Sequence, residues 1–320
     1  MKKILMLLLC PLFLKPAYAT SELGSWNESA KNKITEFVNI TTTIGSDNFI
    51  PVADRIAVFD NDGTLWSEQP AYFQLLFALD QVKQQASKNP TWQTKQPYSD
   101  ILKNNIPSSL SEEQLLELVK QTHTGISSRE FRERVNQWIN DSVHPTTLKP
   151  YTEMVFQPML ELLSYLQQHQ YKTFIVSGGS VEFMRVWASR VYGIPSEQII
   201  GSRFASEYRV IDGQPQVFHL DRIDFINDKE GKPVGIYQAI GKRPVIAFGN
   251  SDGDRAMLEW TAAGEGPRFS ALIHHTDALR EWAYDKNSHV GRLDEALNQA
   301  KHEGWLVVDM KKDWKQVYPN

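Results

Sequence analysis

The stretch RIAVFDNDGTLW, residues 55–66, determines which kind of fold the chain can adopt. Its first half, Arg55-Ile-Ala-Val-Phe59, is apolar on both faces, which is typical of buried strands in parallel sheets. Its second half places two carboxylates, Asp60 and Asp62, one residue apart and directly before a glycine. Carboxylates this close repel each other unless a cation or a developing reaction charge lies between them. The stretch therefore indicates either an ordinary solvated turn or a strand-end loop that carries out chemistry.

Further short apolar runs share this pattern and alternate with helical segments. The predicted strands after the first cover residues 172–176, 243–248, 270–273 and 305–308. The predicted helices that precede or separate them cover residues 25–44, 157–168, 181–192 and 233–240. Strands that alternate with helices predict an α/β fold with a doubly wound, Rossmann-like parallel sheet.

Two segments interrupt this alternation. Residues 67–150 contain helical patterns and no convincing strand, so we expect an α-helical cap inserted after the first strand. Residues 204–225 alternate apolar and polar side chains around Asp212-Gly213, which predicts a small β-hairpin beside the sheet. Residues 20–66 and 151–320 would then form the catalytic core.

The first 19 residues have the pattern of a secretory signal peptide. Two lysines precede an apolar run over residues 4–14, and Ala17-Tyr18-Ala19 matches a small-residue cleavage site. The apolar run is too short to span a bilayer as a helix. Cys10, the one cysteine of the chain, lies in this segment, so a mature chain starting near Thr20 would have no disulfide. We expect a periplasmic or secreted protein that has no membrane partner after signal removal.

The charge balance excludes one class of partner. The chain has 34 Lys and Arg against 38 Asp and Glu, a formal net charge of −4. Some of the lysines lie in the signal segment, so the mature chain would be more acidic still. An acidic chain without a basic stripe argues against a nucleic-acid partner. No protein partner is evident either.

The three clearest strands end in three unusual loops. These loops are Asp60-Asn-Asp-Gly-Thr64, Ser177-Gly-Gly-Ser180 and Gly249-Asn-Ser-Asp-Gly-Asp254. Each alone could be a turn, a plain loop or a calcium-binding type of surface loop. In open α/β sheets, however, ligands bind in the crevice at the carboxyl ends of the strands. We therefore expect the three loops to converge on one site.

The motifs DNDGT, IVSGG and GNSDGD, with a lysine between the last two, resemble the four motifs of the haloacid dehalogenase superfamily, in its phosphatase branch. By layout the chain is similar to phosphoserine phosphatases, which also carry a helical cap after the first motif. The resemblance covers essentially the whole mature chain, although only the motifs are specific. It implies a Mg²⁺-dependent phosphatase that hydrolyses a small phosphorylated metabolite, a phosphomonoester, through an aspartyl-phosphate intermediate.

The resemblance also implies a role for each matching residue. Asp60 would be the nucleophile. Asp62 would protonate the leaving group and then deprotonate the attacking water. Phosphate would be bound by a hydroxyl group and by backbone amides, from Gly63, Ser177, Gly178 and Gly179.

The implied metal ligands come from the first and third loops. Mg²⁺ prefers oxygen ligands, and the matching positions are Asp60, Asp62, Asn250 and Asp254. The third loop departs from the common family pattern GDxxxD, because Asn250 stands where an aspartate usually binds the metal. An amide oxygen can bind Mg²⁺ but brings no negative charge. Weaker metal binding, or recruitment of Asp252 or Asp254, is therefore left open.

Three lysines lie between the second and third strands, namely Lys229, Lys232 and Lys242. Lys232 directly precedes Pro233 at the start of a predicted helix, where its ammonium and the helix N-terminus could face the same phosphate. We therefore predict Lys232 as the catalytic lysine, with Lys229 as the second choice. Lys242 is expected on the surface.

Two other functions remain compatible with the sequence. The same loops would support phosphotransfer to a small alcohol, and Asn250 favours a non-catalytic periplasmic binding protein. Outside the motifs, Glu68 is expected to be a solvated carboxylate, although it could recognise a substrate amine. His274 and His275 are expected to be hydrogen-bonded loop residues rather than metal ligands.

Overall fold

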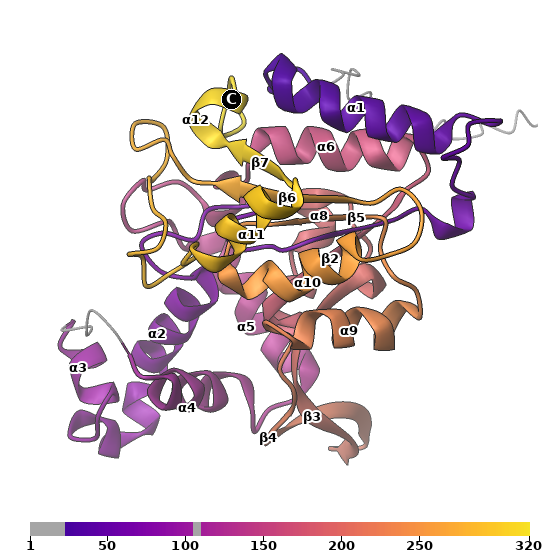
Figure 1. The fold of residues 1–320 in the computed structure, drawn as a ribbon. Coiled ribbons are helices and arrows are strands. Elements are labelled where there is room, and N and C mark those ends of the chain that lie inside the picture. The colour runs from indigo at the N-terminus through magenta and orange to yellow at the C-terminus, as the bar shows by residue number, and fades with distance from the viewer. Residues whose placement is uncertain (1–22, 105–109) are drawn as a thin grey trace, which may run out of the picture.

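The computed structural model describes residues 23–104 and 110–320. These form a central sheet with helices on both faces and a helical insertion that projects from one end (Figure 1). The predicted signal peptide, residues 1–19, lies outside the described residues. Within the described ranges, no helix is both long and apolar enough to cross a membrane.

Across the described residues the sheet has seven strands in the order β4-β3-β2-β1-β5-β6-β7. The strands are β1 (Ile56–Phe59), β2 (Lys172–Ser180), β3 (Ile199–Ile211), β4 (Gln214–Phe225), β5 (Ile246–Gly249), β6 (Phe269–His274) and β7 (Leu306–Asp309). All neighbours pair in parallel except β3 and β4. The central position of β1 brings its loop between those of β2 and β5. The α/β fold with a doubly wound sheet is confirmed.

The two faces of β1 explain why the sheet is covered on both sides. Ala57 and Phe59 join a hydrophobic cluster with α1 (Glu28–Thr42) and α6 (Gln157–Gln168). Ile56 and Val58 join a second cluster on the opposite face. The helices of that face are α9 (Gly231–Ile240), α10 (Arg255–Ala262) and α11 (Glu295–Glu303). Each fully buried large apolar side chain contributes about 1.5–3 kcal/mol, so both layers hold the short central strand in place.

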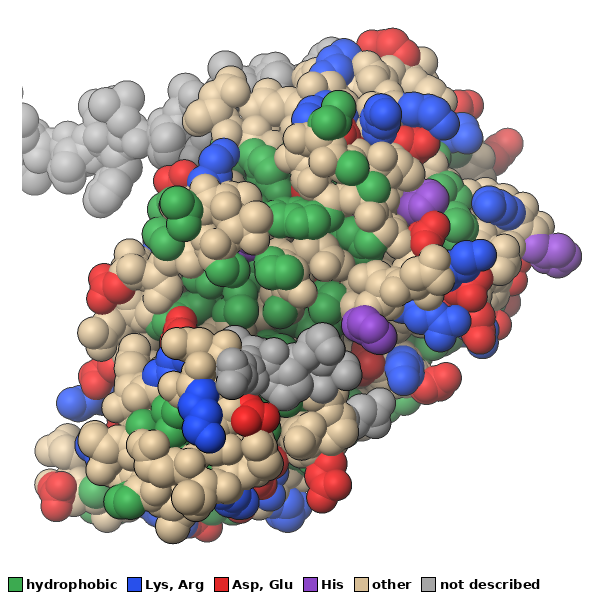
Figure 2. All heavy atoms as spheres, turned by 90° about the vertical axis from the view of Figure 1, so that its left-hand side faces the viewer, with side chains coloured by type: hydrophobic (Ala, Val, Ile, Leu, Met, Phe, Trp, Pro, Cys, Tyr) green, Lys and Arg blue, Asp and Glu red, His purple; other side chains and the backbone are tan. Residues whose placement is uncertain are grey.

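Helices fill the segment between β1 and α6, where the sequence predicts the cap. They are α2 (Phe73–Gln85), α3 (Tyr98–Leu102), α4 (Glu112–His123) and α5 (Ser128–Asp141). Side chains of α2, α3 and α4 form a hydrophobic cluster of their own, which includes Leu79, Tyr98 and Leu118. The face seen in Figure 2 shows hydrophobic side chains gathered between the sheet domain above and this insertion below.

The hairpin is present, but it belongs to the sheet and does not lie beside it. Its first strand, β3, begins at Ile199 and pairs in parallel with β2 before it pairs antiparallel with β4. The turn is at Asp212-Gly213, and both residues have positive φ angles, as tight hairpin turns require. Two backbone hydrogen bonds tie β4 to the insertion: the N–H of His219 donates to the carbonyl of Ile126, and the N–H of Gly125 donates to the carbonyl of His219.

The helix predicted over residues 181–192 is also divided. It consists of α7 (Val181–Arg185) and α8 (Ala188–Tyr192), and the backbone leaves the helical region at Trp187. Trp187 is buried and stacks on Trp66 at a centroid distance of 4.1 Å. A tertiary contact therefore overrides the local helical pattern. The short helix α12 (Met310–Asp313) follows β7 near the C-terminus.

Candidate active site

The three loops meet at the carboxyl ends of β2, β1 and β5, as expected from their positions after neighbouring strands. Asp60 is anchored to β5 because its backbone N–H donates to the carbonyl of Phe248, at 2.9 Å. The register places Phe59 opposite Ile175 of β2 and Phe248 of β5. The order of the strands, rather than any local turn, therefore brings the first loop next to the other two.

Lys232 connects the three strand ends. Its ammonium donates to Oδ1 of Asp60 at 2.5 Å, to Oδ1 of Asp254 at 2.6 Å and to the carbonyl of Val176 at 2.9 Å. Its side chain is only 2% exposed. The ammonium thereby occupies one oxygen of Asp60, and no hydrogen bond from the described residues reaches the other oxygen, Oδ2. Among the candidate lysines, the structure brings Lys232 to the carboxylates.

The two other lysines lie elsewhere. Lys229 is exposed and has a positive φ of 51° in the turn before α9. Lys242 is also exposed and forms an ion pair with Asp54 at 2.6 Å, near the amino end of β1. Neither reaches the three loops.

Asp62 lies beside Asp60 and is held by two donors of unequal strength. The indole Nε1 of Trp66 donates to Oδ1 at 2.9 Å, and the hydroxyl of Ser177 lies 3.5 Å from Oδ2. Burial raises the pKa of Asp62, while the hydrogen bond from Trp66 opposes the rise. A carboxyl group whose pKa is raised towards neutrality can both donate and accept a proton, which suits general acid–base chemistry.

Gly63 is required by the geometry of the first loop. Its φ is +77°, and a Cβ there would lie 2.1 Å from Nδ2 of Asn250 and 2.4 Å from Oε1 of Glu68. A side chain at this position would therefore be strained and would displace the third loop. The close approach shows that the first and third loops are in direct contact.

The second loop presents a hydroxyl group and backbone amides. The N–H of Gly179 donates to the hydroxyl oxygen of Ser177 at 3.0 Å, and the carbonyl of Ser177 accepts from Asn227 at 2.9 Å. The N–H of Ser180 donates to Gln74 of α2 at 2.8 Å. Gly178 faces the side chain of Asp228. The insertion and the loop before α9 therefore both support the second loop.

The two aspartates of the third loop have different surroundings. Oδ2 of Asp254 accepts the backbone N–H groups of Asn250 and Ser251 at 2.9 and 3.0 Å, while its Oδ1 binds Lys232. Oδ1 of Asp252 accepts the N–H groups of Asp294 and Ala296 at the start of α11. The structure brings Asp254 into the cluster and directs Asp252 away from it.

Asn250 contacts the first loop through both atoms of its amide. Its Oδ1 accepts the hydroxyl of Thr64 at 3.1 Å, and its Nδ2 donates to Oε1 of Glu68 at 2.7 Å. Glu68 is 1% exposed and also accepts the hydroxyl of Tyr284 at 2.7 Å. The expectation of a solvated carboxylate at Glu68 is therefore wrong. Burial raises the pKa of Glu68 well above its usual value, against the hydrogen bond from Tyr284.

His275 follows directly after β6 and supports the first loop. Its Nε2 lies 2.7 Å from the carbonyl of Gly63, so Nε2 carries the proton of this hydrogen bond, and its Nδ1 lies 2.9 Å from Glu281. Glu281 also accepts the hydroxyl of Ser67 at 3.0 Å. His275 is thus a hydrogen-bonded residue, as expected, but it holds the turn that contains Asp62.

The donor set fits a hard divalent cation. Four carboxylates gather here: Asp60, Glu68 and Asp254 are buried and Asp62 is half-buried, and Lys232 donates to two of them, Asp60 and Asp254. Burial and the charge of Asp254 raise the pKa of Asp60 well above its usual value, although Lys232 opposes this. Within the described residues, no three His, Cys, Asp or Glu side chains form a complete metal site by themselves. Backbone carbonyl and amide oxygens would therefore have to contribute, and Mg²⁺ accepts both.

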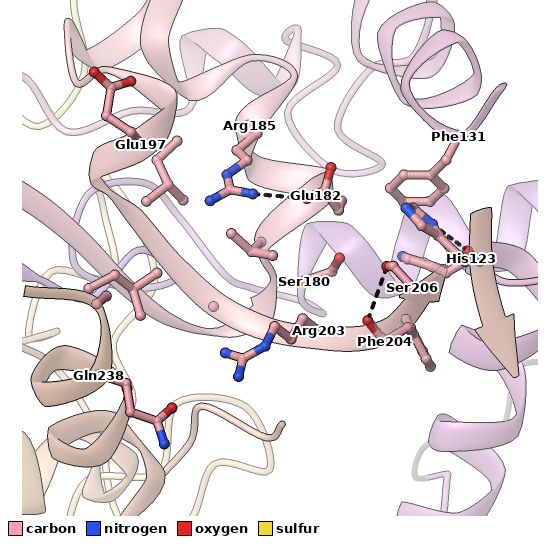
Figure 3. A pocket seen from close by; sticks show the side chains of 17 residues that line it. His123, Phe131, Ser180, Glu182, Arg185, Glu197, Arg203, Phe204, Ser206 and Gln238 are labelled. Carbon is pink, nitrogen blue, oxygen red and sulfur yellow. Dashed lines mark hydrogen bonds and ion pairs between the residues drawn. The ribbon is translucent and has the colours of Figure 1, made fainter. Parts of the chain in front are cut away.

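A cavity of about 400 Å³ adjoins the second loop at Ser180 (Figure 3). It lies between the insertion, α7, β3 and α9, and Ser180, His123, Arg203 and Gln238 are among its lining residues. Arg185 also lines it, where it forms an ion pair with Glu182 at 2.9 Å. None of the four carboxylates described above lines this cavity.

Several residues that shape the site carry no motif in the sequence. Trp66 follows Asp62 by four residues, and this short spacing is the one local signal that could have identified it. Gln74, Asn227 and Tyr284 reach the loops from distant segments. Their roles depend on contacts that no local pattern encodes.

Comparison with known proteins places this site in context. The family model described as haloacid dehalogenase-like hydrolase matches residues 57–259, which include all three loops and Lys232. Among curated proteins, none matches the sequence significantly.

The chain is similar to several solved structures at low sequence identity. A protein with unknown function from Bordetella pertussis Tohama I is 16% identical, with 80% of this chain and 98% of that chain covered and a TM-score of 0.51. A functionally unknown protein from Anaerococcus prevotii DSM 20548 is 15% identical, with 92% and 96% covered and a TM-score of 0.52. A phosphoserine phosphohydrolase-like protein from Francisella tularensis subsp. tularensis SCHU S4 is 17% identical, with 69% and 88% covered and a TM-score of 0.37.

Proposed function

The chain belongs to the haloacid dehalogenase-like hydrolases, and on that premise we propose that it is a Mg²⁺-dependent phosphatase acting on a small phosphomonoester. One observation carries the proposal. Lys232 holds Oδ1 of the buried Asp60, while Oδ2 has no hydrogen-bond partner among the described residues and Asp62 lies in the same loop. This arrangement provides an oriented nucleophile next to a proton donor.

In the first step, Oδ2 of Asp60 attacks the phosphorus atom in line with the ester oxygen. The new bond joins Asp60 to phosphorus, and the bond between phosphorus and the ester oxygen breaks. Asp62, whose pKa is raised, gives its proton to the departing oxygen. The products of this step are the free alcohol and an aspartyl-phosphate at Asp60.

In the second step, water attacks the same phosphorus atom. Asp62, now ionised, takes a proton from the water, and the bond between phosphorus and Asp60 breaks. Inorganic phosphate leaves and both carboxyl groups return to their starting state. Ser177 and the amides of the second loop would bind the phosphate oxygens during both steps.

A bound Mg²⁺ would neutralise the charge on the transferring oxygens. Asp60, the carbonyl of Asp62 and the amide oxygen of Asn250 would hold it. That amide oxygen accepts one hydrogen bond, from Thr64, and retains a second lone pair for a cation. Asp254 braces the third loop and positions Lys232.

The helical insertion would restrict the substrate to small molecules. Its first helix, α2, begins soon after the first loop, and Gln74 accepts a hydrogen bond from the second loop. We also propose that the signal segment directs the protein to the periplasm, with no nucleic-acid or membrane partner.

Hydrolysis of p-nitrophenyl phosphate by the purified protein, with and without Mg²⁺, tests this function. We expect turnover that EDTA removes and Mg²⁺ restores. Asp60→Asn keeps the size of the side chain but removes the nucleophile, so its rate should fall by at least ~10³-fold. Circular dichroism serves as the control that the variant is folded.

Absence of turnover with any divalent cation, or full activity of the Asp60→Asn variant, would contradict the proposal. If p-nitrophenyl phosphate is hydrolysed, a screen of small phosphate esters, scored by kcat/KM, would identify the substrate class.

A further inference from the structure

Asn250 lies where the family pattern has a metal-binding aspartate, and the structure shows what compensates for the missing charge. Nδ2 of Asn250 is 2.7 Å from Oε1 of Glu68, and Oδ1 is 3.1 Å from the hydroxyl of Thr64. The side-chain amide of Asn250 therefore connects the third loop to Glu68 and to Thr64 of the first loop.

The orientation of this amide follows from its neighbours. Oε1 of Glu68 also accepts the hydroxyl of Tyr284, so this oxygen is an acceptor and the group of Asn250 that faces it is the NH₂. The carbonyl oxygen then faces Thr64, whose hydroxyl can donate. An aspartate at position 250 would place a second carboxylate against Glu68, and the two would repel each other. The pair of Asn250 and Glu68 thus contains a single negative charge.

Glu68 is fixed next to the first loop from several sides. Its Oε1 would lie only 2.4 Å from a Cβ on Gly63, the residue whose peptide bond carries the carbonyl of Asp62. Tyr284 donates its hydroxyl to the same Oε1, and its ring stacks on His275 at a centroid distance of 4.4 Å. Gly291 also packs so closely that a Cβ there would overlap Glu68.

The other acidic side chains of the third loop are already engaged. Asp254 has both oxygens occupied, by Lys232 and by N–H groups of its own loop. Asp252 accepts two N–H groups at the start of α11. Among the described residues, Glu68 is the buried carboxylate that contacts the side-chain amide of Asn250, whereas Asp254 contacts its backbone N–H.

We propose that Glu68 supplies the negative charge of the metal site that the third loop lacks, acting together with the amide of Asn250. This inference rests on the proposed metal-dependent function and assigns to that site a residue outside the family's motifs. It predicts that a carboxylate can be exchanged between positions 68 and 250. If Glu68 only braced Tyr284 and Gly291, Glu68→Gln would keep the metal affinity of the wild type, and Asn250→Asp alone would bind the metal more tightly.

Metal binding without substrate provides the test. Free Mn²⁺ is measured by electron paramagnetic resonance during titration of the full-length protein, and Mg²⁺ competition gives the affinity for Mg²⁺. The variants are Glu68→Gln, Asn250→Asp and the double variant. Glu161→Gln is the matched control, because Glu161 is a partly buried glutamate held by Ser25 and Gln157, away from the site.

We expect Glu68→Gln to weaken Mn²⁺ binding by about 10–100-fold, the usual effect of losing a group that supports a metal site. The double variant should bind within about threefold of the wild type, and Glu161→Gln should be unchanged. Unchanged affinity in Glu68→Gln would overturn the inference. So would a double variant that binds as weakly as Glu68→Gln.

Thermal unfolding of each metal-free variant shows whether it is folded. If Glu68→Gln does not fold, the double variant is compared with Asn250→Asp. The exchange is supported when the double variant has wild-type affinity and Asn250→Asp alone binds no more tightly than the wild type. Loss of affinity in the double variant, or tighter binding by Asn250→Asp alone, overturns it. A wild-type protein that binds no Mn²⁺ overturns both this inference and the metal dependence. Hydrolysis that depends on Asp60 is measured separately. Failure of the proposed phosphatase function can therefore be distinguished from failure of the inference about Glu68.

Discussion

Lys232 is held by three oxygens at once, and both of its carboxylate partners are buried. Burial alone would lower its pKa, but the charges of Asp254 and Asp60 outweigh burial and raise it. The ammonium therefore carries its charge at neutral pH. Removing this ammonium would leave the carboxylates of Asp60 and Asp254 without a positively charged partner.

We predict that Lys232→Met lowers the free energy of unfolding of the metal-free protein by about 3–5 kcal/mol at pH 7, because it removes one partner of a buried ion pair. The rate of phosphate ester hydrolysis should fall as well. Urea unfolding monitored by circular dichroism measures the first effect.

Lys242→Met is the control, because the pair of Lys242 with Asp54 is about half exposed and contributes at most about 1 kcal/mol. Equal destabilisation by the two substitutions would contradict the role assigned to Lys232. Retained activity in Lys232→Met, together with lost activity in Lys229→Met, would transfer the catalytic role to Lys229.

The sequence identifies the side chains that follow strands, and it misses those that reach the site from elsewhere. Asp60 and Asn250 directly follow strands of the sheet, and Ser177 lies among the last residues of β2, so all three are predictable and the structure brings them together. The burial of Glu68 depends on Asn250 and Tyr284, which lie far along the chain. Its environment therefore leaves no local pattern.

Helix α4 ends at His123, which is 1% exposed and whose pKa burial lowers to about 3. Its Nε2 is 2.9 Å from Nε2 of Gln74, which can only donate, so this ring nitrogen is unprotonated. In the unfolded chain the pKa is about 6.5. Between these two values the unfolded state binds more protons, so stability is lost as the pH falls from about 6.5 towards 3.

We therefore predict that His123→Phe reduces the acid sensitivity of the protein. Its ring would keep the packing against Phe77 and Phe131 but has no proton to gain. Urea unfolding at pH 7.5, 6.5, 5.5 and 4.5 gives the comparison. Below pH 6.5 the wild type should lose up to about 1.4 kcal/mol more per pH unit than the variant. Parallel curves for the two proteins would show that His123 is not buried in its neutral form.

Helices and strands with a clear hydrophobic periodicity are predicted well from the sequence. Those whose limits depend on contacts with distant segments are not. The helix α6 coincides with its predicted range, and the core strands lie within a few residues of theirs. The break between α7 and α8 depends on the stacking of Trp187 on Trp66. The entry of β3 into the sheet depends on its pairing with β2, and periodicity alone carries no information about either partner.

For the molecule as a whole, export makes a prediction about covalent structure. Cleavage after Ala19 would remove Cys10 and leave a mature chain that starts near Thr20 without cysteine. Intact mass and N-terminal sequencing of protein from the periplasmic fraction test the cleavage. The melting temperature of that protein should be the same with and without dithiothreitol. An uncleaved chain, or one confined to the cytoplasm, would contradict the proposal.

The central position of β1 has a consequence for the timing of folding. Its neighbours are β2, which begins at Lys172, and β5, which begins at Ile246, so the earliest strand must wait for partners made much later. The backbone bridge between Trp26 and Trp314 joins segments that are still farther apart in the sequence. Such long-range pairing slows folding. A growing chain that has not yet reached β5 lacks the carbonyl of Phe248 that accepts the backbone N–H of Asp60, so the candidate site assembles only after the third loop has been synthesised.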